Sequence, residues 1–402
     1  MSISQQAAGT ASWGARGSAS GGVWAELVGQ QAAVSVLTRA VQGDAHAMSH
    51  AWLITGPPGS GRSNAARAFA AALQCRWGGC GECNDCRTAL SGAHPDVTLV
   101  RTEMLSIGVD EVRDLVRRAA MSPTLGRHQV LVVEDADRVT ERGADALLKS
   151  IEEPAAKTVW LLCAPTAEDV VPTIVSRCRQ LGLTTPNADA VAQLLVSRDG
   201  IDLTLAAYAA RAAQGHIGRA RVLARDEGAR NRRREVLKIP GQLRDLAGCL
   251  TAAANLVDAC AEEAKAATSE LDAREKADLQ EALGFGARGA RPKGAAGAIK
   301  DLEDQQKARA KRIQRDAIDR ALTELTGYYR DVLTLQTGAA AQLINGELSG
   351  ELGATARQST PEATLRRIDA LLACRTALET NVAPLLAVEA MMIALVEATR
   401  PG

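Results

Sequence analysis

The stretch Ala51-Trp-Leu-Ile-Thr-Gly-Pro-Pro-Gly-Ser-Gly-Arg-Ser63 decides the fold of the N-terminal part of this 402-residue chain. Its first five residues form an apolar run that predicts a buried strand, and residues 62–74 predict a helix. A Gly-rich loop between a strand and a helix is the usual cradle for nucleotide phosphates, because backbone N–H groups of the loop and the helix point at the anion. The stretch therefore predicts an α/β fold of the nucleotide-binding type.

The loop itself departs from the usual phosphate-loop pattern at one position. Arg62 stands where phosphate loops carry lysine, and a planar guanidinium does not replace a compact ammonium conservatively. Ser63 could still face a magnesium ion. Two interpretations stay open. The loop is either a weak ATP or ADP site formed by Gly56, Gly59, Gly61, Arg62 and Ser63, or a strand-to-helix turn that no longer binds tightly.

Four cysteines follow the loop at once: Cys75, Cys80, Cys83 and Cys86. The spacing C-x4-C-x2-C-x2-C gives the ligand count and closeness that a tetrahedral zinc ion needs, and four thiolates make a closed, structural site. A redox pair at Cys83 and Cys86 and four untethered thiols are the alternatives. Only four residues separate Cys75 from Cys80, so Cys75 is the least secure ligand.

Periodicity outlines the rest of the chain. Apolar runs at 97–100, 130–133 and 158–163 predict further strands, and residues 109–120 predict a helix between them. Continuous apolar strands separated by helices indicate a parallel, doubly wound sheet. Beyond about residue 185 the pattern is helical. Two segments are expected to lack fixed structure: the Ser/Gly/Ala-rich residues 1–22 and the basic, Gly-rich residues 284–297.

Composition restricts the function classes. Net charge is zero, with 46% hydrophobic and 23% charged residues, so a contact with DNA would have to be local. Arginine outnumbers lysine 38 to 9, which we interpret as a coding bias. No apolar run approaches the length of a membrane span, and residues 1–22 lack the features of a signal peptide. A cytoplasmic, reducing location without membrane contact is expected.

Two further motifs contain residues of the types that act in phosphoryl transfer. The segment Val130-Leu-Val-Val-Glu-Asp-Ala-Asp137 is similar to a strand that ends in a magnesium-binding Asp and a catalytic Glu, but here Glu134 precedes Asp135. Misplacement of a catalytic group by about 1 Å can cost roughly a hundredfold in rate. The segment Val171-Pro-Thr-Ile-Val-Ser-Arg-Cys178 contains a Ser-Arg-Cys signature. An arginine such as Arg177 is otherwise most often part of a surface ion pair.

With these motifs the chain resembles the clamp-loader subunits of bacterial DNA polymerase III, which belong to the AAA+ class. The likeness is strongest to the delta-prime type and looser to the gamma/tau type and to replication factor C. It covers residues from roughly 23 to 225 and continues more thinly beyond them. The segments that carry it, in addition to the phosphate loop and the four cysteines, are Val28-Gly-Gln30, His94-Pro-Asp96, Ala146-Leu-Leu-Lys-Ser-Ile-Glu-Glu-Pro154, Ser176-Arg-Cys178 and Tyr328-Tyr-Arg-Asp-Val332.

The resemblance implies three domains. They are an AAA+ core at residues 23–184 with a zinc module at 75–86, a helical lid at 185–240 and an all-α collar at 241–402 that oligomerises. It also implies partners: the gamma/tau and delta subunits, the ring-shaped beta sliding clamp, and primer–template DNA within the assembled complex.

The resemblance further implies that Arg177 reaches the ATP of a neighbouring subunit, where a guanidinium offsets charge on the transferring phosphoryl group. Ala164-Pro165 stands in place of a threonine sensor, and Gly218 or, with a shift of one position, Arg219 stands at a second sensor. We therefore expect a subunit without useful ATP hydrolysis that serves a partner ATPase. The alternatives are an ATP-hydrolysing motor of the gamma/tau type and a zinc-dependent nucleic-acid-binding protein.

Basic clusters are the last candidates for DNA contact. They are Arg113, Arg117 and Arg118, and the run Arg230, Arg232, Arg233 and Arg234. Most such clusters are solvated faces, and the densely charged residues 300–320 predict a long exposed helix.

Overall fold

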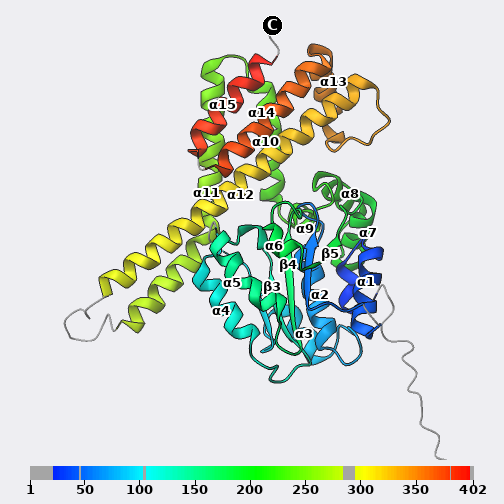
Figure 1. The fold of residues 1–402 in the computed structure, drawn as a ribbon. Coiled ribbons are helices and arrows are strands. Elements are labelled where there is room, and N and C mark those ends of the chain that lie inside the picture. The colour runs from blue at the N-terminus through cyan, green and yellow to red at the C-terminus, as the bar shows by residue number, and fades with distance from the viewer. Residues whose placement is uncertain (1–20, 45–46, 103–105, 284–294, 381, 399–402) are drawn as a thin grey trace, which may run out of the picture. The chain divides into compact units, whose positions relative to one another are not determined.

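The computed structural model describes residues 21–44, 47–102, 106–283, 295–380 and 382–398 (Figure 1). The chain divides into two compact units, of which the first comprises most of the residues up to 200 together with 215–217, and the second comprises residues 201–214 and 218–402. Residues 1–20 of the expected tail and 284–294 of the expected loop lie outside the described residues.

The first unit is built on one five-stranded sheet in the order β2-β3-β4-β1-β5, and every pair of neighbouring strands is parallel. The strands are β1 (Ala51–Thr55), β2 (Val97–Val100), β3 (Gln129–Val133), β4 (Thr158–Ala164) and β5 (Arg179–Gly182). The four predicted strands are confirmed, and so is the parallel sheet. The sequence reasoning missed β5, which pairs with β1 at the edge of the sheet.

Helices cover both faces of this sheet. The helices of the unit are η1 (Gly22–Glu26), α1 (Gln31–Gln42), α2 (Arg62–Gln74), α3 (Asn84–Ser91), α4 (Val109–Ala119), η2 (Ala136–Arg138), α5 (Glu141–Glu152), α6 (Pro172–Val175) and α7 (Ala188–Asp199). Alternate strand residues serve the two faces: Trp52 and Ile54 pack with α1 and α2, whereas Ala51 and Leu53 belong to the cluster that includes α4 and α5. Since both faces are covered, the strands are apolar without alternation.

The second unit is helical. Its helices are α8 (Leu203–Ala212), α9 (Ile217–Arg225, which begins in the first unit), α10 (Glu227–Gln242), α11 (Leu246–Ala282), α12 (Ala295–Thr337), η3 (Gly346–Leu348), α13 (Ser349–Gln358), α14 (Pro361–Glu379) and α15 (Pro384–Glu397). Helices α10 to α15 share one hydrophobic core that includes Leu256, Leu325 and Met392. Figure 1 shows α11 and α12 side by side along most of their length.

Ion pairs connect α11 and α12. Arg309 of α12 pairs with Asp272 and Glu275 of α11, at 2.6 and 2.5 Å between nitrogen and oxygen. Residues 300–320 lie within α12, as predicted. Among the described residues, no helix combines the length and apolar content that crossing a bilayer requires.

Candidate nucleotide and metal sites

The Gly-rich loop connects the carboxyl end of β1 to the start of α2. Gly59 and Gly61 have φ angles of +85° and +92°, a region that favours glycine. Gly59 is also closely packed, because a Cβ at this position would lie 2.5 Å from the Cβ of His216. The loop therefore has the glycine conformations of a phosphate cradle, but a histidine packs directly against its middle.

The side chain of Arg62 folds back onto its own loop. Its Nη1 donates to the carbonyl oxygen of Gly56 at 2.5 Å. Gln30, which follows Val28-Gly29, donates through Nε2 to the carbonyl oxygen of Ser60 at 3.1 Å. The Ser60 hydroxyl is buried and has no hydrogen-bond partner. The basic side chain at the lysine position is thus bonded to the loop backbone.

The acidic residues after β3 have partners of their own. Glu134, whose side chain is 7% exposed, pairs with Arg67 of α2 at 2.7 Å between Oε1 and Nη2. Asp137 lies nearby, and burial together with the charge of Asp135 raises its pKa. A carboxylate paired with an internal arginine is not available as a base for a water molecule unless the pair opens.

The two positions that the resemblance assigns to sensors also have no free polar side chain aimed at the loop. The strand β4 ends at Ala164, and the carbonyl oxygen of Pro165 accepts from the N–H of Gly56 at 3.0 Å. Neither residue offers a side-chain hydroxyl. Arg219, the candidate at the second position, forms an ion pair with Glu324 of α12, so its guanidinium is bound within the helical unit.

Arg177 lies just after the short helix α6. Its Nη1 donates to the carbonyl oxygen of Thr173 at 2.8 Å, and its guanidinium pairs with Glu152 at the end of α5. Both side chains are more than one third exposed, at 37% and 44%. Such a pair contributes little to stability. The arginine is thus held at the surface of the first unit and can exchange its partner at low cost.

The four cysteines form one cluster where α2 ends and α3 begins. Their sulfur atoms all lie within 4.8 Å of one another, and Cys75 Sγ is 3.7 Å from Cys80 Sγ and 3.8 Å from Cys83 Sγ. For a tetrahedral ion with Zn–S bonds of about 2.3 Å, neighbouring sulfurs lie about 3.8 Å apart. The four residues therefore fit a tetrahedral metal ion, with Cys75 as a full member. All four are free cysteines.

Backbone N–H groups point at these sulfurs. Those of Trp77 and Cys83 lie 3.3 and 3.4 Å from the sulfurs of Cys75 and Cys80. Burial opposes ionisation of Cys75, but N–H groups of Cys80, Gly79 and Trp77 bring its pKa down to about 7. Burial raises the pKa of Cys86. A divalent cation would remove this conflict, because a coordinating thiol loses its proton.

The two basic clusters differ in solvent exposure and in their ion pairs. Arg113 and Arg117 are exposed and pair with Asp110 and Asp114 on their own helix. The expectation of a solvated face is wrong for Arg233, which is 4% exposed. Its Nε lies 3.1 Å from Glu324 Oε2, and its Nη1 contacts Glu347 Oε1 at 2.8 Å and the Tyr208 hydroxyl at 3.0 Å.

The structure thus brings the predicted loop residues and the acidic segment to one edge of the sheet, and it gathers the four cysteines. Arg177 lies elsewhere on the same unit. The sequence reasoning missed Arg67 and the buried partners of Arg233. The spacing of Arg67, five residues after Arg62 on a helix, carried no signal for an ion pair with Glu134.

The fold and the site define a parallel α/β domain of the nucleotide-binding type, with a four-cysteine module and a following helical unit. Residues 29–187 match the family model described as "DNA polymerase III, delta subunit". In this segment the chain is similar to DNA polymerase III delta-prime and related clamp-loader subunits.

Individual relatives have the names of such subunits. The chain is 40% identical over 148 residues to DNA polymerase III subunit delta′ of Pseudomonas aeruginosa, covering 35% of this chain and 45% of that protein. It is 36% identical over 159 residues to the gamma/tau subunit of Mycobacterium bovis, covering 38% of this chain and 27% of that protein. The matches therefore span less than half of these relatives.

A solved structure was also matched. It is a DNA polymerase III gamma subunit-related protein from Thermotoga maritima, at 16% identity and a TM-score of 0.41, covering 91% of this chain and 99% of that one.

Proposed function

We propose that this chain is a non-hydrolysing subunit of a sliding-clamp loader, which supplies Arg177 to the ATP site of a neighbouring subunit. The proposal rests on how Arg62 and Glu134, the charged residues of the chain's own phosphate-loop site, are bonded. Arg62 is bonded to the carbonyl oxygen of Gly56, and Glu134 is bonded to Arg67. Phosphoryl transfer depends on positioned charges, and here both side chains are already bonded within the protein.

The surface position of Arg177 supports the second half of the proposal. In the clamp loaders that this chain resembles, the arginine of the Ser-Arg-Cys signature acts on the ATP of the adjacent subunit. Transfer of Arg177 from Glu152 to a triphosphate would exchange one anionic partner for a more highly charged one.

The proposed arrangement comprises an AAA+ core at 23–184, a lid at 185–240 and an oligomerising collar at 241–402. Its partners would be gamma/tau, delta, the beta clamp and primer–template DNA.

We further propose that the four cysteines hold a structural zinc ion. Sulfur ligands in tetrahedral spacing are typical of closed zinc sites without an open coordination position. The cluster also packs against the start of the domain, because the N–H of Val23 donates to the carbonyl oxygen of Gly79 at 3.1 Å. Bound zinc would fix this segment to the end of α2.

The test is ATP turnover by a complex reconstituted from this chain and its gamma/tau and delta partners. The Arg177→Ala variant should assemble normally and should slow turnover at least about tenfold, since a trans arginine contributes 10³-fold or more in related reactions. Arg198→Ala is the matched control, because Arg198 is also a half-exposed arginine paired with a glutamate, Glu26, in the same unit. Equal turnover in the two variants would refute the role of Arg177.

The competing function is an ATP-hydrolysing motor, since a gamma/tau subunit is 36% identical to this chain over 159 residues. The purified chain alone distinguishes the two. Turnover on the order of 1 s⁻¹ that Ser63→Ala abolishes would establish the motor and overturn the proposal.

A further inference from the structure

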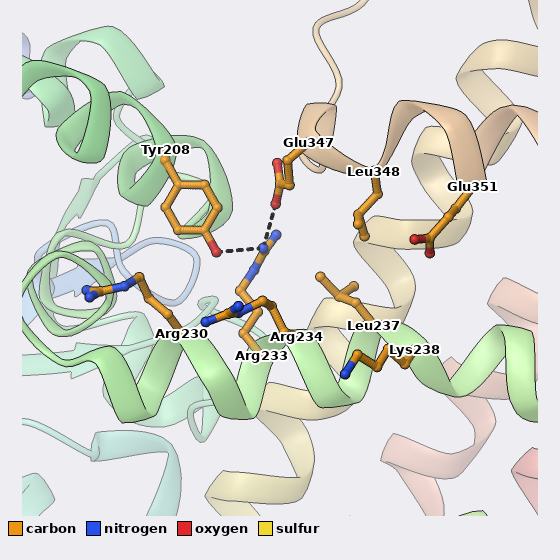
Figure 2. Close-up of a pocket in the computed structure, with 9 residues that line it drawn as sticks. All are labelled: Tyr208, Arg230, Arg233, Arg234, Leu237, Lys238, Glu347, Leu348 and Glu351. Carbon is orange, nitrogen blue, oxygen red and sulfur yellow. Dashed lines mark hydrogen bonds and ion pairs between the residues drawn. The ribbon is translucent and has the colours of Figure 1, made fainter.

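The helical unit contains a cavity that the proposed function does not use. Its volume is about 320 Å³, and it lies between α10 and the segment formed by η3 and α13, with Tyr208 of α8 at one end (Figure 2). This volume is within the range of small-ligand pockets. Leu237 and Leu348 give it an apolar floor.

One wall of the cavity is cationic. Arg230, Arg234 and Lys238 line it, and they follow each other at intervals of four residues along α10. Residues at this interval lie on one face of a helix, about 6 Å apart along its axis. The three charges therefore form a row along the cavity.

Two of these cations are not neutralised. Arg230 donates to the carbonyl oxygens of Leu223 and Ala224, at 2.8 and 3.2 Å, and Arg234 donates to the side-chain amide of Asn231. Among the residues that the structure describes, neither guanidinium is paired with a carboxylate. Lys238 does have such a partner, Glu235, at 2.7 Å.

The buried Arg233 fixes the shape of the cavity. Its guanidinium joins α10 to Glu347 at the opposite wall and to the Tyr208 hydroxyl, as Figure 2 shows. Its remaining bonds go to Glu324 and Asn345. Because every nitrogen of the Arg233 guanidinium is hydrogen-bonded within the unit, Arg233 positions the walls and leaves Arg230 and Arg234 to bind a ligand.

We propose that this cavity binds the phosphate group of a single nucleotide unit. Guanidinium groups offer forked donors that match phosphate oxygens, and the apolar floor beside Tyr208 can accept the flat face of a base. The exposed Glu351 at the far wall disfavours a continuous track of phosphates, but it can accept a hydrogen bond from an N–H group of a base. The nucleotide could be free or could be one unit of a DNA strand. This inference does not depend on the proposed role of Arg177.

The test uses the full chain and two probes, deoxythymidine monophosphate in calorimetric titration and a fluorescein-labelled oligo(dT) in anisotropy. Arg234→Ala should weaken binding about tenfold, the effect of losing one charge-assisted contact. Arg232→Ala is the matched control, because Arg232 is an exposed arginine of α10 that pairs with Asp226 at 3.2 Å and does not line the cavity. Arg234→Lys, which keeps the charge but loses the fork, should fall between them.

The probes distinguish the sources of the phosphate. Binding of the monophosphate would identify a free nucleotide, and binding of the oligonucleotide alone would identify a strand. The proposal is overturned if neither probe binds, if both variants weaken binding equally, or if polyglutamate competes as well as the oligonucleotide per charge. It is also overturned if Arg62→Ala removes binding while Arg234→Ala does not, since the nucleotide would then occupy the phosphate loop.

Discussion

Glu134 and Arg67 form an ion pair between the end of β3 and the first turns of α2, with Oε1 2.7 Å from Nη2 and 2.9 Å from Nε. The same oxygen thus accepts from two nitrogens of one guanidinium. This pair joins the acidic segment to the helix that follows the phosphate loop. It holds the carboxylate in place where an ATPase would keep it available for chemistry.

We expect this pair to contribute measurably to folding. Because the Glu134 side chain is only 7% exposed, loss of its partner leaves a nearly buried carboxylate, so Arg67→Ala should destabilise the chain by about 1–2 kcal/mol. A double-mutant cycle with Glu134→Gln in urea unfolding should give a coupling of similar size. The exposed pair Arg113–Asp110 is the control, with a coupling below about 0.5 kcal/mol. Equal coupling in the two pairs would contradict the structural role.

We expect the phosphate loop to give the chain no stabilisation by nucleotide. A site with a Kd of about 10 μM would stabilise the native state by about 2.7 kcal/mol at 1 mM ligand, which would raise the melting temperature by several degrees. Thermal unfolding of the Arg234→Ala variant, in which the proposed cavity is weakened, should show no such shift with 1 mM MgATP or MgADP. Arg62→Lys should not restore one, because Glu134 remains paired with Arg67. A clear shift that Ser63→Ala abolishes would show that the loop binds nucleotide.

Much of the first unit could be predicted from the sequence. Buried strands between helices are long apolar runs, so β1 and β3 were visible as such. The edge strand β5 was not, because Arg-Gln-Leu-Gly has neither an apolar run nor β-branched residues, and its pairing with β1 depends on the register of the whole sheet. The clustering of the four cysteines was also predictable, because their close spacing in the sequence keeps them near one another in space.

Buried charge could not be predicted in the same way. Arg233 stands in a run of arginines that resembles a solvated face, and its partners Glu324 and Glu347 are about a hundred residues away in the sequence. Only the tertiary packing of α10 against α12 decides which arginine of the run is enclosed. Local periodicity contains no information on that choice.

Arg233 should therefore be the arginine of this run with the largest effect on stability. Breaking a buried ion pair by removing one partner costs about 3–5 kcal/mol, so Arg233→Ala should lower the free energy of unfolding by about that amount. Arg234→Ala, one residue away and exposed, should change it by less than about 0.5 kcal/mol. Chemical denaturation of both variants measures the difference, and similar values would show that the network around Glu324 contributes little.

Metal analysis should find one zinc ion per chain. Because the ligands must lose their protons, the ion should be retained at neutral pH and released on acidification. Cys75→Ser should abolish binding and lower the melting temperature, since Cys75 lies close to two other sulfurs of the cluster. Cys178→Ser is the control, because Cys178 belongs to the same unit but not to the cluster. Full zinc content in Cys75→Ser would contradict the four-sulfur site.

Asp96 should make the stability of the chain depend on pH. Its carboxylate is buried and accepts from the N–H groups of Thr124, Leu125 and Gly126, at 2.6, 2.8 and 2.5 Å. Burial opposes the charge, but these three bonds lower the pKa of Asp96 below the ordinary value of an aspartate. The group therefore binds fewer protons in the folded state than in the unfolded state.

The sign of the effect follows from this difference. The stabilisation is fully present above the unfolded pKa and is lost as the pH falls through the folded pKa. Asp96→Asn, which keeps one acceptor but removes the charge, should be less stable than the parent chain at pH 7. The two unfolding free energies should converge as the pH falls below about 4. A constant difference across that window would mean that the charge of Asp96 does not hold residues 124–126 in place.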